Sequence, residues 1–275
     1  GTTQGRGQTM FNEMMRAEIW LQETLESDRT IEELAVVLGY SSSQIRRRFR
    51  QCFGFSPSGY RENLRLEKAA RLLAYTPRSI RDVAGLCGYT NHSAFSRAFL
   101  RRYRQSPRDY RHARRASLQE VSQPGPTTAP EVCTLAPCTA VVTRCYVDPL
   151  KLEPPAAWAR ALWEETPPQG VPVDTPAIAL LHDTATDCRL PKLDLGVLID
   201  TERAGSLAMP PSLRLLALPA TRSACLPLPE VRKLEPALES LLAVTLPELG
   251  EHYSGDPIRL VADADRLELQ LPLAT

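Results

Sequence analysis

One segment of the chain occurs twice, and this repeat constrains the fold more than any other feature. Residues 39–60 read GYSSSQIRRRFRQCFGFSPSGY, and residues 88–110 read GYTNHSAFSRAFLRRYRQSPRDY. Glycine, arginine, phenylalanine, proline and tyrosine recur in the same order, with one extra residue in the turn of the second copy. So many matches in a fixed order predict a duplicated structural unit.

Each copy is predicted to fold as a helix, a tight turn and a second helix. Apolar residues at three- and four-residue spacing predict the first helices, at about 31–38 and 80–87. Gly39 and Gly88 stand where a left-handed residue ends a helix, and the Ser, Thr and Asn residues after them can cap the next one. A long amphipathic helix over about 57–75 is expected to join the two copies.

The second helix of each copy presents the polar and basic side chains that could contact a ligand. On a helical wheel, Ile45, Phe49 and Cys52 form the buried stripe in the first copy, and Phe95 and Phe99 form it in the second. The opposite faces carry Arg, Ser and Gln, and arginine can donate two hydrogen bonds to one guanine. The alternative is a basic, solubilising surface helix. A rigid spacer would place both helices in successive major grooves, so that a monomer suffices to bind DNA.

Charge and proline are divided unevenly along the chain. Residues 1–116 contain 21 Lys and Arg against 11 Asp and Glu, a balance of +10, whereas residues 117–275 have 12 against 21, a balance of −9. Only 3 of the 24 prolines lie in the first part. We therefore expect a helical domain that meets a polyanion, followed by a domain of different construction.

The composition also bears on location and redox state. No stretch approaches the length of a membrane span, and the seven cysteines include no CxxC pair. Both features favour a reducing cytoplasm and argue against membrane contact. We expect residues 1–9 to be an expression remnant, residues 10–115 to form the helical domain and residues 116–130 to be a linker.

The first half resembles the DNA-binding domain of the AraC/XylS family of bacterial transcription regulators. The resemblance rests on IxxLAxxxGYS, RRFRxxFGxSPxxY, SIxDVAxxxGY and SxFSRAFxxxYxxSPxxYR, over about residues 14–111. It implies double-stranded DNA and RNA polymerase as partners, activation as the usual outcome, and no cofactor. The residues expected to read bases are Ser43, Gln44, Arg47, His92, Ser93, Ser96 and Arg97, and those expected to contact phosphate are Arg46, Arg50 and Arg101. For His92, helix capping or a phosphate contact is the alternative.

The second half, residues 131–275, is predicted to be an α+β domain in which one element order runs twice. Strands are expected in 132–147, 177–183, 193–200, 212–228, 259–263 and 266–273, with helices at 156–166 and 230–245. The full chain is thus expected to be multidomain: an all-α domain with two helix-turn-helix units, then an α+β domain.

The order of these elements, with GEHYSGDP at 250–257 and LELQLPL at 267–273, resembles the GyrI-like effector-binding domain of Rob-like regulators. The resemblance implies a ligand site at Glu251 and Tyr253, with Trp158 and Trp163 as the available aromatic residues. A carboxylate there favours a cationic, apolar ligand. The scarcity of aromatic residues favours instead a smaller or aliphatic ligand, or a protein partner.

Three other functions remain open for this half. Its five cysteines could sense a soft metal or an oxidant, although their spacing does not match a zinc site. The whole chain could be an architectural DNA binder without an effector. The GyrI-like half could be a hydrolase, but no nucleophile and base stand out, so no catalytic or metal-binding residue is predicted.

Overall fold

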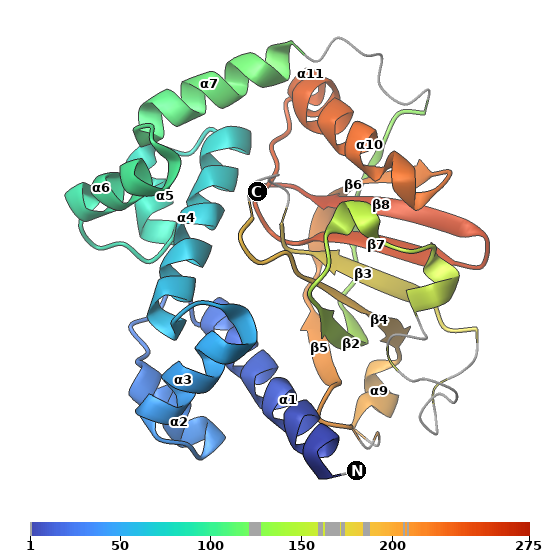
Figure 1. Cartoon of the computed structure of the whole chain (residues 1–275). Coiled ribbons are helices and arrows are strands. Elements are labelled where there is room, and N and C mark those ends of the chain that lie inside the picture. Colours follow the sequence, from blue (N-terminus) through green and yellow to red (C-terminus); the bar gives the residue numbers. More distant parts are fainter. Residues whose placement is uncertain are drawn as a thin grey trace. The chain divides into compact units, whose positions relative to one another are not determined.

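The computed structural model describes residues 2–120, 128–158, 162, 171, 174–183, 188–205, 207 and 209–275. The chain divides into two compact units, Gly1–Ala113 and Arg114–Thr275 (Figure 1). Among the described residues, no helix combines the length and the apolar character that a membrane crossing requires.

The first unit is built of helices. In chain order they are α1 (Thr2–Glu23), α2 (Ile31–Leu38), α3 (Ser42–Phe53), α4 (Pro57–Tyr75), α5 (Ile80–Leu86), α6 (His92–Tyr103) and α7 (Pro107–Gln119). Residues 2–9, expected to be an expression remnant, form the start of α1, and the predicted linker begins within α7. The predicted pairs of helices and the joining helix are confirmed.

The repeated glycine, serine and proline residues lie at the ends and starts of helices, as predicted. Gly39 follows α2 with φ 74°, and Gly88 follows α5 with φ 84°. The hydroxyl oxygens of Ser56 and Ser106 accept hydrogen bonds from backbone N–H groups at the start of α4 and α7. A proline occupies the first turn of each of these helices, where its missing N–H costs nothing.

Aromatic side chains fill the core of each repeat. Phe49 packs against Tyr60 with ring centroids 5.5 Å apart, and Phe99 packs against Tyr110 at 5.3 Å. The Tyr60 hydroxyl donates to the buried carboxylate of Glu18, which ties α4 to α1. The same pair of rings thus anchors the second helix in both copies, and its other face is left to solvent.

The second unit is an eight-stranded antiparallel sheet with short helices, counted over the described residues. Its strands are β1 (Glu131–Leu135), β2 (Cys138–Cys145), β3 (Ala177–Leu181), β4 (Leu193–Ile199), β5 (Arg214–Leu218), β6 (Thr221–Leu228), β7 (Ile258–Asp263) and β8 (Arg266–Pro272). Its helical segments are Pro149–Lys151, Pro155–Ala157, α9 (Thr201–Ala204), Val231–Lys233, α10 (Leu234–Ser240), the π-helical Leu241–Thr245 and α11 (Leu246–Leu249). Most of the predicted helix at 156–166 lies outside the described residues.

The strand order supports the predicted internal repeat. The order is β1-β6-β8-β7-β3-β4-β2-β5. If β1 to β4 are exchanged with β5 to β8 in turn, the same order results, read from the opposite edge of the sheet. β3 and β7 pair at the centre, where the two halves meet. The first strand of each half pairs with the second strand of the other half, so neither half completes its sheet alone.

Two short connections force this sheet to curl. Residues 136 and 137 alone join β1 to β2, although these strands are six positions apart in the sheet. A flat sheet would separate them by about 29 Å, at about 4.8 Å per strand, whereas two linking residues span only about 10 Å. Residues 219 and 220 are likewise the only link between β5 and β6, which are also six positions apart in the sheet. The sheet is therefore a half-barrel with an inner and an outer face.

Alternation along the strands decides which side chains face inward. Ile178 and Leu180 of β3 belong to one hydrophobic cluster with Leu218 of β5, although β4 and β2 lie between these strands. Such a contact across the curl is possible only on the concave side, so alternate residues that share a face with Ile178 form the inner face. The opposite parity includes Val141 and Val197, which pack against Leu162 on the outer side. The inner face also carries charged and thiol side chains, and the outer parity is largely apolar.

Candidate nucleic-acid interface

Helix α3 begins with a capping box. The Ser41 hydroxyl oxygen accepts from the backbone N–H of Gln44 at 3.2 Å, and the Gln44 side-chain oxygen accepts from the backbone N–H of Ser41 at 3.0 Å. The helix ends at Gly54, which has φ 80°. Because its oxygen belongs to the cap, Gln44 has only its NH₂ group to offer to a base.

The arginine face of α3 lies opposite its buried stripe. Ile45 and Phe49 are 0% exposed, so they fix the rotation of the helix about its axis. Ser43 and Arg47 are exposed on the other side. The predicted orientation of this helix is thereby confirmed, whereas the assignment of its residues to individual bases stays a prediction.

Helix α6 repeats this arrangement with a different cap. The side-chain oxygen of Asn91 accepts from the backbone N–H of Ala94 at 3.0 Å, so Asn91 and not His92 caps the helix. His92 is its first residue, and His92, Ser93 and Arg97 are all exposed. Ser96, also predicted to read a base, is half-buried.

The three arginines predicted to contact phosphate have different surroundings. The Arg46 guanidinium pairs with Glu32 of α2 at 3.2 Å, and Arg101 lies 3.7 Å from the Glu62 carboxylate. Arg50 is exposed in the last turn of α3. The ion pairs join well-exposed side chains, so they are weak and could exchange a carboxylate for a phosphate.

Arg48, the third member of the run at 46–48, is held against the protein. Its guanidinium lies 4.5 Å from the centre of the Tyr40 ring. The Tyr40 hydroxyl contacts the Glu13 carboxylate, and this hydrogen bond, together with burial, raises the pKa of Tyr40. Three consecutive arginines thus divide into one ion-paired, one exposed and one stacked side chain.

Other arginines stabilise the fold, a role that was not predicted for them. Arg61 donates to the carbonyl oxygen of Arg29, before α2, and Arg111 donates through Nε to the carbonyl oxygen of Leu73 at 3.0 Å, near the end of α4. Arg61 and Arg111 occupy equivalent positions in the two repeats. Their recurrence in the helices that follow α3 and α6 was the available signal for this shared structural role.

The candidate ligand residues of the second unit have partners within the protein. The Glu251 carboxylate accepts two hydrogen bonds from Arg222, one of them at 2.7 Å, and these hydrogen bonds lower the pKa of Glu251. Tyr253 is 1% exposed, and its hydroxyl donates to the carbonyl oxygen of Asp256. The charge of Glu251 is therefore already balanced.

The two tryptophans differ in what the structure says of them. Trp158 is 0% exposed, and its indole N–H donates to the carbonyl oxygen of Glu153 at 2.8 Å. This environment is that of a core residue. Trp163 lies outside the described residues, so its predicted role stays a prediction.

A buried charge cluster surrounds Asp194 on β4. Its carboxylate accepts from Arg144 Nε at 3.0 Å, from Arg214 at 2.8 and 2.9 Å, and lies 2.7 Å from His182 Nε2. Burial alone would raise the pKa of Asp194, but Arg144, His182 and Arg214 hold it well below its ordinary value. Burial lowers the pKa of His182, although its hydrogen bond with Asp194 acts in the opposite direction.

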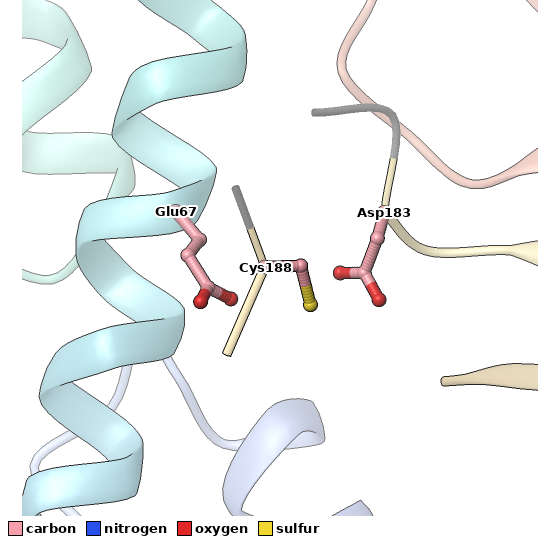
Figure 2. Close-up of side chains that lie close together, drawn as sticks. All are labelled: Glu67, Asp183 and Cys188. Atoms are coloured by element: carbon pink, nitrogen blue, oxygen red, sulfur yellow. The ribbon is translucent and has the colours of Figure 1, made fainter. Parts of the chain in front are cut away.

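Within each unit, the metal-binding side chains that the structure describes do not gather at one point. Figure 2 shows three residues of this type: Glu67 on α4 of the first unit, and Asp183 and Cys188 of the second. Considered unit by unit, the described residues hold no group of three such side chains close enough to share one ion. Asp183 pairs instead with the Lys192 ammonium at 3.3 Å.

The first unit is therefore of the class of double helix-turn-helix domains with basic exposed helices. A family model described as a helix-turn-helix domain matches residues 34–113. The transcriptional activator RhaS of Enterobacter sp. (strain 638) is 37% identical over 100 residues, which are 36% of this chain and 36% of that protein. The chain thus matches little more than a third of the length of this curated relative. The matched region is a helix-turn-helix domain that is similar to part of this activator.

Solved structures also resemble parts of the chain. The DNA-binding domain of AdpA, a global transcriptional factor solved with a target DNA, is 33% identical and covers 38% of this chain and 94% of its own, with a TM-score of 0.37. The EcmrR C-terminal domain is 14% identical and covers 53% of this chain and 97% of its own, with a TM-score of 0.38.

Proposed function

We propose that the chain is a sequence-specific DNA-binding transcription regulator of the AraC/XylS type. The observation that carries the proposal is the matched exposure of Arg47 and Arg97. Both side chains point away from fully buried phenylalanines, at the same place in two capped helices. Arginine in a major groove can donate two hydrogen bonds to guanine O6 and N7.

The composition of the two helices argues against a merely solubilising role. Neither SSQIRRRFRQCF of α3 nor HSAFSRAFLRRY of α6 contains an acidic residue. Surface helices gain stability from pairs of opposite charge three or four residues apart, and these helices have none of their own. The exposed arginines of these helices, such as Arg47 and Arg97, are therefore available to a polyanion.

The joining helix supports binding by a single chain. α4 has 19 residues, so it is about 28 Å long at about 1.5 Å per residue. Successive major grooves on one face of DNA are about 34 Å apart. We propose that α3 and α6 enter successive grooves as parts of one monomer.

The direct test is selection of bound sequences from a pool of random duplexes, followed by footprinting. The proposal expects two conserved half-sites centred about one helical turn apart. An architectural binder would instead recover no common sequence, and that result would refute the proposal. Activation through RNA polymerase in the cytoplasm is the proposed setting, and matching relatives are named transcriptional activators. The proposal assigns no enzymatic reaction to the chain.

The second unit is proposed to take the regulatory ligand, and the charges favour an anion. Arg259 of β7 is 7% exposed on the inner face, and its guanidinium donates to the carbonyl oxygen of Pro219 at 3.2 Å. Among the described residues no carboxylate forms an ion pair with it, although Asp256 attracts it at longer range, and burial lowers its pKa. A buried charge without an opposite partner is costly, so a ligand carboxylate would be stabilising.

This part of the proposal is tested by ligand-induced shifts of the unfolding temperature. The probes are a series of aliphatic and aromatic carboxylates and the alkylammonium ions of matching size. Carboxylates should stabilise the wild-type chain and the control Arg266→Gln, in which an exposed arginine is lost, but not Arg259→Gln. Stabilisation by the ammonium series, abolished in Glu251→Gln, would support the site expected from the family resemblance instead.

A further inference from the structure

Two thiols from opposite halves of the second unit lie in contact. Cys133 is on β1 and Cys225 is on β6, and their sulfur atoms are 3.5 Å apart. The register places Cys133 opposite Ser223 and Cys225 opposite Glu131, so the cysteines are diagonal neighbours on one face of the strand pair. Ninety-two positions of sequence separate them. Both residues are free thiols.

The two thiols differ in accessibility. Cys133 is partly exposed, whereas Cys225 is 5% exposed. Burial, followed by the hydrogen bond with Cys133, raises the pKa of the Cys225 thiol. A dissolved oxidant therefore meets Cys133 first, and Cys225 stands behind it as the only described thiol in contact with it.

The position of β1 makes closure of the pair possible. β1 is the first strand in the sheet order and pairs only with β6 among the described strands. A disulfide needs the sulfur atoms about 2.05 Å apart, so they must approach by about 1.5 Å. An edge strand can make such a shift while it disturbs a single ladder of hydrogen bonds.

We infer that Cys133 and Cys225 are an oxidisable dithiol, which closes to a disulfide between the two halves of the second unit. A hydroperoxide oxidises the Cys133 thiol to a sulfenic acid and is itself reduced to water or an alcohol. The Cys225 sulfur then attacks the Cys133 sulfur. The S–S bond forms, the S–O bond breaks, and the hydroxyl leaves as water with the Cys225 proton. A cellular dithiol reverses the step.

The test is a map of the cross-links in the full chain after treatment with one equivalent of hydrogen peroxide. Remaining thiols are alkylated, and the protein is digested without reduction. Trypsin leaves Cys133 and Cys138 on one peptide, between Arg115 and Arg144, so fragmentation and the variant Cys138→Ser must distinguish them. Cys138 is the matched control, because it is also partly exposed on the inner face but has no described sulfur partner.

The inference expects a cross-link between Cys133 and Cys225 in the wild type and in Cys138→Ser. It expects none in Cys133→Ser or Cys225→Ser, and complete reversal by dithiothreitol. If a serine variant fails to fold, the cross-link map of the wild type is sufficient to test the inference. The inference is overturned if peroxide consumes other thiols while Cys133 and Cys225 remain free to be alkylated, or if Cys225 links to Cys138. No DNA is present, so the outcome is independent of the proposed function.

Discussion

Gly88 lies so close to the backbone of Leu25 that a β-carbon on it would be 2.7 Å from the Leu25 carbonyl oxygen. Its repeat partner Gly39 has the same left-handed backbone, but a β-carbon there would meet nothing within 4 Å. The two glycines that punctuate the repeat thus serve different needs. Gly39 supplies only a conformation, whereas Gly88 supplies a conformation and a close approach.

This difference predicts unequal effects of the same substitution. Gly39→Ala should cost about 1–2 kcal/mol of unfolding free energy, which is the cost of a left-handed alanine. Gly88→Ala should cost a further ~1–3 kcal/mol, because the backbone of Leu25 must move. Urea unfolding of the two variants measures both values. Equal losses would show that the contact at Gly88 relaxes freely.

Arg47 and Arg97, the two arginines proposed to read bases, are each expected to act on one half of the DNA site. Arg47→Ala and Arg97→Ala should each weaken binding to the selected duplex by about 1–3 kcal/mol and relax base preference in one half-site only. Fluorescence anisotropy with half-site variants of the duplex measures both effects. Arg81→Ala is the control, since Arg81 is exposed on α5, outside the reading helices. A uniform loss on every duplex would make Arg47 and Arg97 phosphate contacts.

Arg46 is expected to be restrained by Glu32, its ion-pair partner on α2. Glu32→Gln removes a negative charge beside the arginine face of α3 and frees Arg46 for a phosphate. Binding should tighten several-fold on all duplexes, with a steeper dependence on salt, because one more counterion is released. Glu23→Gln makes the same charge change at an exposed residue of α1 and should leave the salt slope unchanged. An unaltered slope in Glu32→Gln would place Arg46 away from the DNA.

The sequence predicted the two helix-turn-helix units and the helix that joins them because their signals are local, whereas α1 was not predicted. The glycines, the capping residues and the apolar spacing each act within a few positions, and the repeat doubles every signal. The roles of individual charged side chains depend instead on residues farther away in the sequence. Glu32 forms an ion pair with Arg46, and Arg222 neutralises the charge of Glu251. No spacing along the chain predicts the second of these pairs. The contact between Cys133 and Cys225 likewise depends on the exchange of strands between the two halves, which only the sheet order reveals.

The cluster around Asp194 should be a major source of stability for the second unit. Asp194→Asn removes the buried carboxylate that pairs with Arg144 and Arg214, and loss of one partner of a buried ion pair costs about 3–5 kcal/mol. Asp200→Asn is the matched control, because the contact that the structure describes for Asp200, with Arg203 at 3.9 Å, is exposed. It should change stability by less than about 1 kcal/mol. Equal stability of the two variants in urea would mean that Arg144 finds another partner.

The same cluster predicts that mild acid destabilises the second unit. Burial lowers the pKa of His182 in the folded state, so below about pH 6.5 the unfolded chain binds a proton that the folded chain does not. The stability is therefore complete above this pH and falls as the pH decreases through the folded pKa. The low pKa of Asp194 adds a second loss with the same sign, below about pH 3.9. Urea midpoints measured from pH 8 to pH 4 should fall in the wild type. In His182→Gln the decline between pH 6.5 and pH 5 should be smaller, and an identical decline would exclude His182 as its source.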